Sequence, residues 1–123
     1  MNATLRAQRA YSRGAQPMRT PRSTEYETVA RITYKLKRAA QDGAAGFPAL
    51  VAALQDNRKL WRIFASDVAD PDNPLPADLK ARIFYLAEFT FQHTSKVLER
   101  KASIAPLLDI NASILRGLRR GAD

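Results

Sequence analysis

The chain is 123 residues long, with a formal net charge of +8, no cysteine and a single histidine. This length suits one domain, and the lack of cysteine excludes disulfides, thiolate nucleophiles and cysteine-bound zinc, so we expect neither a metal nor a cofactor. No apolar run is long enough to span a membrane, and the first twenty residues lack the apolar middle of a secretory signal, so we expect a cytoplasmic protein without membrane insertion.

The beginning of the chain carries much of the positive charge. Residues 1–19 show little sustained periodicity, and Gly14 and Pro17 interrupt any short turn. The first 22 residues hold no acid but five arginines: Arg6, Arg9, Arg13, Arg19 and Arg22. We therefore predict a basic, mobile N-terminal arm over residues 1–19.

A first helix is predicted from Thr20, which suits a cap, and Pro21, which suits the first helical position. Thr24 and Glu27 offer an alternative capping box. The apolar face that follows comprises Tyr26, Val29, Ile32 or Thr33, Leu36 and Ala40, and the run ends at Gly43 and Gly46.

Two further helices are predicted on either side of "DPDNPLP", residues 70–76, whose three prolines break the helical pattern. The second helix begins at Pro48 and shows the face Leu50 or Val51, Leu54, Asn57, Trp61, Phe64 and Val68. The third begins near Pro76 and shows the face Leu79, Ile83, Leu86, Thr90, His93 and Val97, with Phe89 and Phe91 off that face.

A shorter fourth helix is predicted over residues 103–118, with the face Ile104, Leu107 or Leu108, Asn111, Ile114 or Leu115, and Leu118. Isolated helices of this length are marginal in water, so their apolar faces must pack together. The sequence predicts an all-α bundle of about four helices, with one domain over residues 20–118 and a tail over 119–123.

Two asparagines fall on apolar faces. Asn57 lies between Leu54 and Trp61, and Asn111 occupies an equivalent place on the fourth helix. An unpaired buried amide costs about 1 to 3 kcal/mol, so each should be hydrogen-bonded. We expect structural polar ties to the 70–76 loop or to each other, and favour the loop; the alternative is a groove in which a partner's backbone satisfies them.

The chain resembles the FlaF family of flagellar biosynthesis regulatory proteins. The resemblance covers nearly the whole chain in order, in the segments "AYSR" (10–13), "TPRSTEYETVARIT" (20–33), "DNRKLW" (56–61), "DVADPDNPLPADLKARI" (67–83) and "IAPLLDINASILRGL" (104–118). The stretch 41–47 and the tail "RRGAD" match nothing in that pattern.

This resemblance implies a regulator that binds flagellin and supports its synthesis and export as a secretion chaperone or adaptor. It also implies possible contact with the partner regulator FlbT, which acts on flagellin messenger RNA, and with the flagellar export apparatus. A second hypothesis is a post-transcriptional regulator that touches flagellin mRNA through the basic arm, although Tyr11 alone would stack on bases there.

Catalysis is not expected. The chain lacks a nucleophile elbow, a glycine-rich phosphate loop and a zinc-binding helix motif. His93 lies on an apolar face, where a lone histidine is usually a hydrogen-bonded core residue. Asp67, Asp70 and Asp72 lack the glycine and closing glutamate of an EF-hand, so the loop between helices reads as a turn.

The predicted partner-binding surface is an apolar groove for an amphipathic helix of flagellin, beside a basic rim. Its residues would be Leu60, Trp61, Phe64, Phe89 and Phe91. The alternative for Trp61 is a core position, which is the commoner place for a single indole. The arm has further interpretations, as a segment that wraps an acidic client or as a solvated tail.

Overall fold

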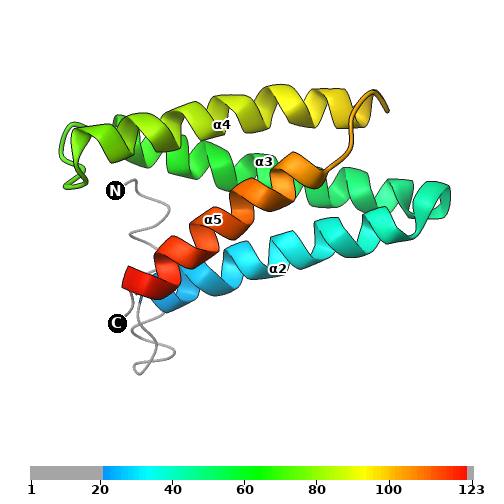
Figure 1. Cartoon of the computed structure of the whole chain (residues 1–123), viewed down its shortest axis with the longest axis horizontal. Coiled ribbons are helices and arrows are strands. Elements are labelled where there is room, and N and C mark those ends of the chain that lie inside the picture. The colour runs from blue at the N-terminus through cyan, green and yellow to red at the C-terminus, as the bar shows by residue number, and fades with distance from the viewer. Residues whose placement is uncertain (1–20, 122–123) are drawn as a thin grey trace.

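The computed structural model describes the backbone of residues 21–121 and the side chains of residues 25–118. The described residues form four α-helices and one short 3-10 helix (Figure 1), namely α2 (Pro21–Gln41), η1 (Gly43–Gly46), α3 (Phe47–Ala69), α4 (Ala77–Leu98) and α5 (Ala105–Gly121). The prediction of an all-α bundle of four helices is confirmed. The predicted arm, with Arg6, Arg9, Arg13 and Arg19, lies outside the described residues, as does the side chain of Arg22.

The helices begin and end where the local sequence favours it. Pro21 opens α2, and Pro48 lies in the first turn of α3, where a missing backbone N–H costs nothing. Gly43 has φ 59, a left-handed conformation that suits glycine, and it follows the end of α2. Because α2 is already helical at Pro21, the alternative capping box at Thr24 does not start it. At the other end, α5 continues to Gly121, past the predicted end at Leu118.

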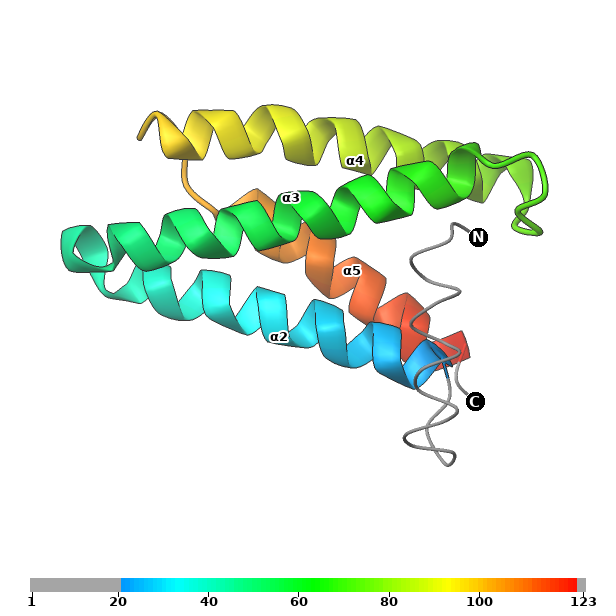
Figure 2. The same cartoon turned by 180° about the vertical axis from the view of Figure 1, so that it is seen from behind.

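The helices α2, α3 and α4 lie side by side, with α3 between the other two (Figures 1 and 2). α5 starts beside the end of α4 and runs diagonally to the beginning of α2, so it packs mainly on α2 and touches α4 much less. The core lies where these helices meet, and its apolar members include Val29, Ile32, Leu36, Leu54, Leu60, Trp61, Ala87, Val97, Ile104 and Leu107.

The face of α4 that packs on α3 is made of small and polar side chains. Ala87, Thr90, Thr94 and Val97 are its buried members, at helical spacing. Small side chains bury less apolar area than leucines, so α4 contributes less to the core than α2 or α3. Within residues 21–121, no helix combines the length and the apolarity needed to cross a membrane.

Candidate partner-binding surface

Asn57 and Asn111 are fully buried and bonded to each other. Asn111 Nδ2 donates to Asn57 Oδ1 at 2.8 Å and to Thr33 Oγ1 at 3.1 Å. Trp61 Nε1 donates to Asn111 Oδ1 at 2.9 Å. One amide on α5 therefore ties that helix to both α2 and α3, and these polar side chains belong to the interior rather than to a partner's groove.

The expectation that Asn57 fixes its helix to the 70–76 loop is wrong. That role belongs to Asn73, whose Nδ2 donates to the carbonyl of Asp67 at 3.0 Å and whose Oδ1 accepts from Leu75 N at 2.9 Å. Asn57 lies more than two turns before the end of α3, too far from the loop for a short side chain to reach.

The sequence-predicted groove is not assembled at Leu60 and Trp61. Both are buried, and Trp61 has 0% exposure, so neither offers a surface to a partner in this conformation. Phe64 is half-buried, with its ring edge-on to Trp61 at 5.2 Å between centroids. Full burial of the Trp61 indole is favourable because its N–H has an internal acceptor on α5.

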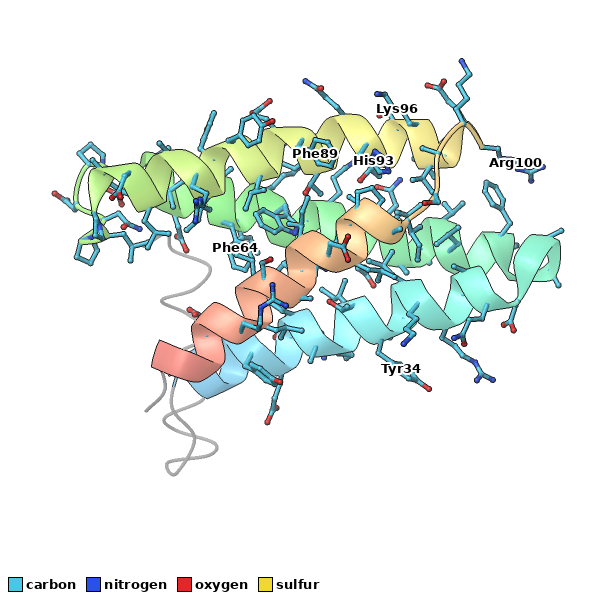
Figure 3. The ribbon with its side chains drawn as sticks, in the orientation of Figure 1. Tyr34, Phe64, Phe89, His93, Lys96 and Arg100 are labelled. Carbon is cyan, nitrogen blue, oxygen red and sulfur yellow. The ribbon has the colours of Figure 1, made fainter. Side chains whose placement is uncertain are left out.

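On α4, Phe89 and Phe91 are half-buried, and Phe89 stacks on His93 with 5.4 Å between ring centroids (Figure 3). His93 is itself half-buried. Its Nε2 lies 2.7 Å from the carbonyl of Ser103, and because a carbonyl only accepts, this nitrogen donates. His93 therefore fixes the segment between α4 and α5. Among the described residues no group of three acidic, histidine or cysteine side chains is placed to hold a metal ion.

The large apolar side chains that remain exposed gather at one end of the α3–α4 hairpin. Among residues 25–118, five large hydrophobic residues are exposed, and four of them fall between positions 75 and 85: Leu75, Leu79, Phe84 and Tyr85. We call these four residues the hairpin surface. The fifth, Tyr34, lies on α2.

The loop that presents the start of this surface is held by its own polar side chains. Asp70 Oδ1 accepts from Asp72 N at 2.9 Å, and Asn73 Oδ1 accepts from Leu75 N at the same distance. Both are turns in which a side chain replaces a backbone acceptor. The loop is thus a helix stop, a turn and a restart, and its hydrogen bonds fix where Leu75 leaves the bundle.

The first half of α4 exposes large apolar side chains on more than one side, between charged residues. At 100° per residue, Leu79 and Phe84 lie on opposite flanks of the face that meets α3, and Tyr85 points away from it. Here α5 diverges from α4 toward α2 and leaves this half of the helix uncovered (Figures 1 and 2).

Sequence reasoning missed Phe84 and Tyr85 and placed Leu79 on a buried face. The signal that identifies them is the run Ile83 to Leu86, four consecutive apolar or aromatic residues in a surface helix. A helix that is buried on one side needs apolar residues only at the positions that face the core. An uninterrupted apolar run therefore indicates a function for the residues of the run that face outward.

The family model described as "Flagellar protein FlaF" matches residues 7–118, most of the chain. Comparisons with curated proteins and with solved structures gave no match.

Proposed function

This chain belongs to the FlaF family of flagellar proteins, and we propose that it binds flagellin through the hairpin surface and keeps the subunit competent for export. Binding rather than catalysis is the proposed activity. The single observation that supports it is the concentration of exposed Leu75, Leu79, Phe84 and Tyr85 at one end of the α3–α4 hairpin. Several large apolar side chains exposed within one short segment of a small protein often mark a protein interaction site.

The proposed client is an amphipathic helix, because the hairpin surface consists of apolar side chains held by a helix and an ordered loop. Phe84 would pack against the apolar face of the incoming helix, and the adjacent Tyr85 would combine ring packing with a hydrogen bond through its hydroxyl. Leu79, on the other flank of α4, would contact a further part of the client. Covering this face shields apolar groups of both partners from water, which prevents the client from aggregating before export.

The positions of charged residues support a polar rim around these contacts. Asp78, Lys80, Arg82 and Glu88 place charges of both signs along the same half of α4, and Asp78, Arg82 and Glu88 are exposed. Mixed charges at a rim contribute little affinity, but they select orientation and partner. Four apolar contacts with a mixed rim resemble the composition of ordinary protein interfaces.

The test is isothermal titration of purified monomeric flagellin into the full chain and into Leu79→Ala combined with Phe84→Ala. Truncation of two anchoring side chains should weaken binding by about a hundredfold, since each hot-spot residue contributes more than about 1 kcal/mol. Both residues are exposed, so the fold should survive, which circular dichroism checks.

A matched control tests whether flagellin binding depends on the hairpin surface or on any exposed aromatic side chain. Tyr85 and Tyr34 are 68% and 66% exposed on different helices. Tyr85→Ala should weaken flagellin binding about tenfold, whereas Tyr34→Ala should leave it unchanged. Equal effects of the two substitutions, or no effect of the Leu79 and Phe84 pair, would place flagellin binding elsewhere.

A further inference from the structure

A second surface of different character lies on α2. Its exposed face carries Arg31, Tyr34, Lys35, Lys37 and Arg38, and no acidic residue occurs between Thr28 and Gln41. Figure 3 shows Tyr34 projecting from the side of α2 that faces away from the other helices. We call these five residues the α2 ridge.

The α2 ridge is a row of like charges. None of its four cations takes part in an ion pair within the part of the chain whose side chains are described. Arg31 and Lys35 are four residues apart and Lys35 and Arg38 three apart, which makes neighbouring like charges that destabilise a helix by about 0.2 to 0.5 kcal/mol per pair. An exposed tyrosine in the middle of such a row adds apolar area that the fold does not use.

A row of cations around an exposed aromatic ring is complementary to a surface that is acidic and partly apolar. We propose that the α2 ridge binds an acidic amphipathic helix of another protein. Arg31, Tyr34 or Lys35, and Arg38 follow the spacing i, i+3 or i+4, i+7, so they form one row about 10.5 Å long on the helix. A partner helix that carries carboxylates at the same spacing meets the cations turn by turn. The apolar side chains of the partner helix, which lie between its carboxylates, cover the Tyr34 ring.

A nucleic acid fits the same ridge less well. Surfaces that bind single strands stack successive bases on several aromatic rings, and Tyr34 is the one exposed aromatic residue of α2 within residues 25–41. The regular helical spacing of the cations matches the turns of a partner helix, as charged positions do in paired helices. The ridge lies on α2, and the hairpin surface lies on α4 and the loop before it, so this proposal is independent of the flagellin proposal.

The test uses fluorescence anisotropy to measure binding of the full chain to a labelled, capped 21-residue peptide made of three Glu-Ala-Leu-Glu-Ala-Ala-Glu repeats. The comparison probes are the same peptide with one alanine of its middle repeat replaced by proline, which breaks the helix, and a 20-nucleotide oligouridylate. The chain variants are Arg31→Gln with Arg38→Gln, and Tyr34→Ala. A charge-matched control is Lys59→Gln with Arg62→Gln, two exposed cations on α3.

We expect the arginine pair to weaken peptide binding about tenfold, and Tyr34→Ala to weaken it about fivefold. The control on α3 should change binding less than about twofold, because only screened long-range attraction is lost. The proline peptide should bind at least about tenfold more weakly than the helical one.

Three results would overturn the proposal. Equal losses in the arginine pair and the α3 control would show attraction to net charge alone. Equal binding of the two peptides would show that helical spacing is irrelevant. Oligouridylate binding that depends on the α2 ridge, without binding of the helical peptide, would assign the ridge to nucleic acid instead.

Discussion

Trp61 on α3 donates its indole N–H to Oδ1 of Asn111 on α5 at 2.9 Å, and both side chains are fully buried. The same amide of Asn111 donates to Asn57 and Thr33. Buried polar groups that are paired in this way have few alternative partners. Together with the apolar side chains of α5 that pack on the core, Asn111 therefore helps to fix the diagonal position of this helix, which leaves the first half of α4 uncovered by α5.

Replacement of that amide should be costly. In Asn111→Ala, the Trp61 N–H and the Asn57 Oδ1 both lose their partner inside the core, and each such loss costs about 1 to 3 kcal/mol. We expect the free energy of unfolding to fall by about 3 kcal/mol in urea titrations followed by the fluorescence of Trp61. Ser113→Ala, at an exposed position of the same helix, should change it by less than about 0.5 kcal/mol. Similar effects of both substitutions would contradict the role given to Asn111.

Two buried threonines on α4 should respond differently to the same substitution. Thr90 Oγ1 has no hydrogen-bond partner among the described residues, whereas Thr94 Oγ1 donates to the carbonyl of Thr90 at 2.6 Å. Thr90→Val removes a buried hydroxyl that makes no hydrogen bond with the described residues, whereas Thr94→Val removes a hydroxyl that does make one. We expect the Thr90 variant to be more stable than the Thr94 variant by about 1 kcal/mol, measured by thermal and chemical denaturation. The reverse order would show that the Thr90 hydroxyl is satisfied in solution.

The approach of η1 to α2 depends on the absence of a side chain at Gly46. A Cβ there would lie 2.2 Å from the carbonyl oxygen of Ala39, a backbone atom that cannot move aside alone. Gly46→Ala should lower the free energy of unfolding by about 2 kcal/mol, as overpacking does. Gly117 in α5 has open space around it, so Gly117→Ala should raise stability by about 1 kcal/mol through helix propensity. Equal effects of the two changes would contradict the close approach.

Arg100 ends α4 in a conformation that normally belongs to glycine. Its φ is 62, and Lys101 N donates to the carbonyl of Lys96 at 2.8 Å, as in a Schellman motif. Its guanidinium lies 4.3 Å from the centre of the Phe47 ring. Arg100→Gly and Arg100→Ala both lose this cation–π contact, but glycine relieves the left-handed strain. The glycine variant should be the more stable by about 1 kcal/mol in denaturant titrations; equal stability would mean that the backbone there is unstrained.

The helices were predictable because the residues that start and end a helix act locally. Pro21 and Pro48 mark helix starts, and three prolines mark the α3–α4 loop, so each helix falls within a few residues of its predicted place. The burial of Asn57 and Asn111 was also predictable, since each is flanked by apolar residues at helical spacing.

Which helices meet was not predictable, because periodicity identifies a face but not the neighbour that covers it. Asn57 therefore had two possible partners, and the sequence favoured the wrong one. Leu79 shares a helical face with Thr90, yet it is exposed because α5 turns toward α2 before reaching it. The candidate surface depends on this crossing angle and becomes visible only in the fold.

Hydrogen–deuterium exchange of the chain with and without monomeric flagellin tests the central claim most directly, because it needs no substitution. Binding at the hairpin surface should slow exchange about tenfold or more in peptides that cover residues 75–88, since a covered helix opens less often. Peptides that cover residues 31–38 of α2 should exchange as before. Unchanged exchange over residues 75–88, with slowing elsewhere in the chain, would contradict the account.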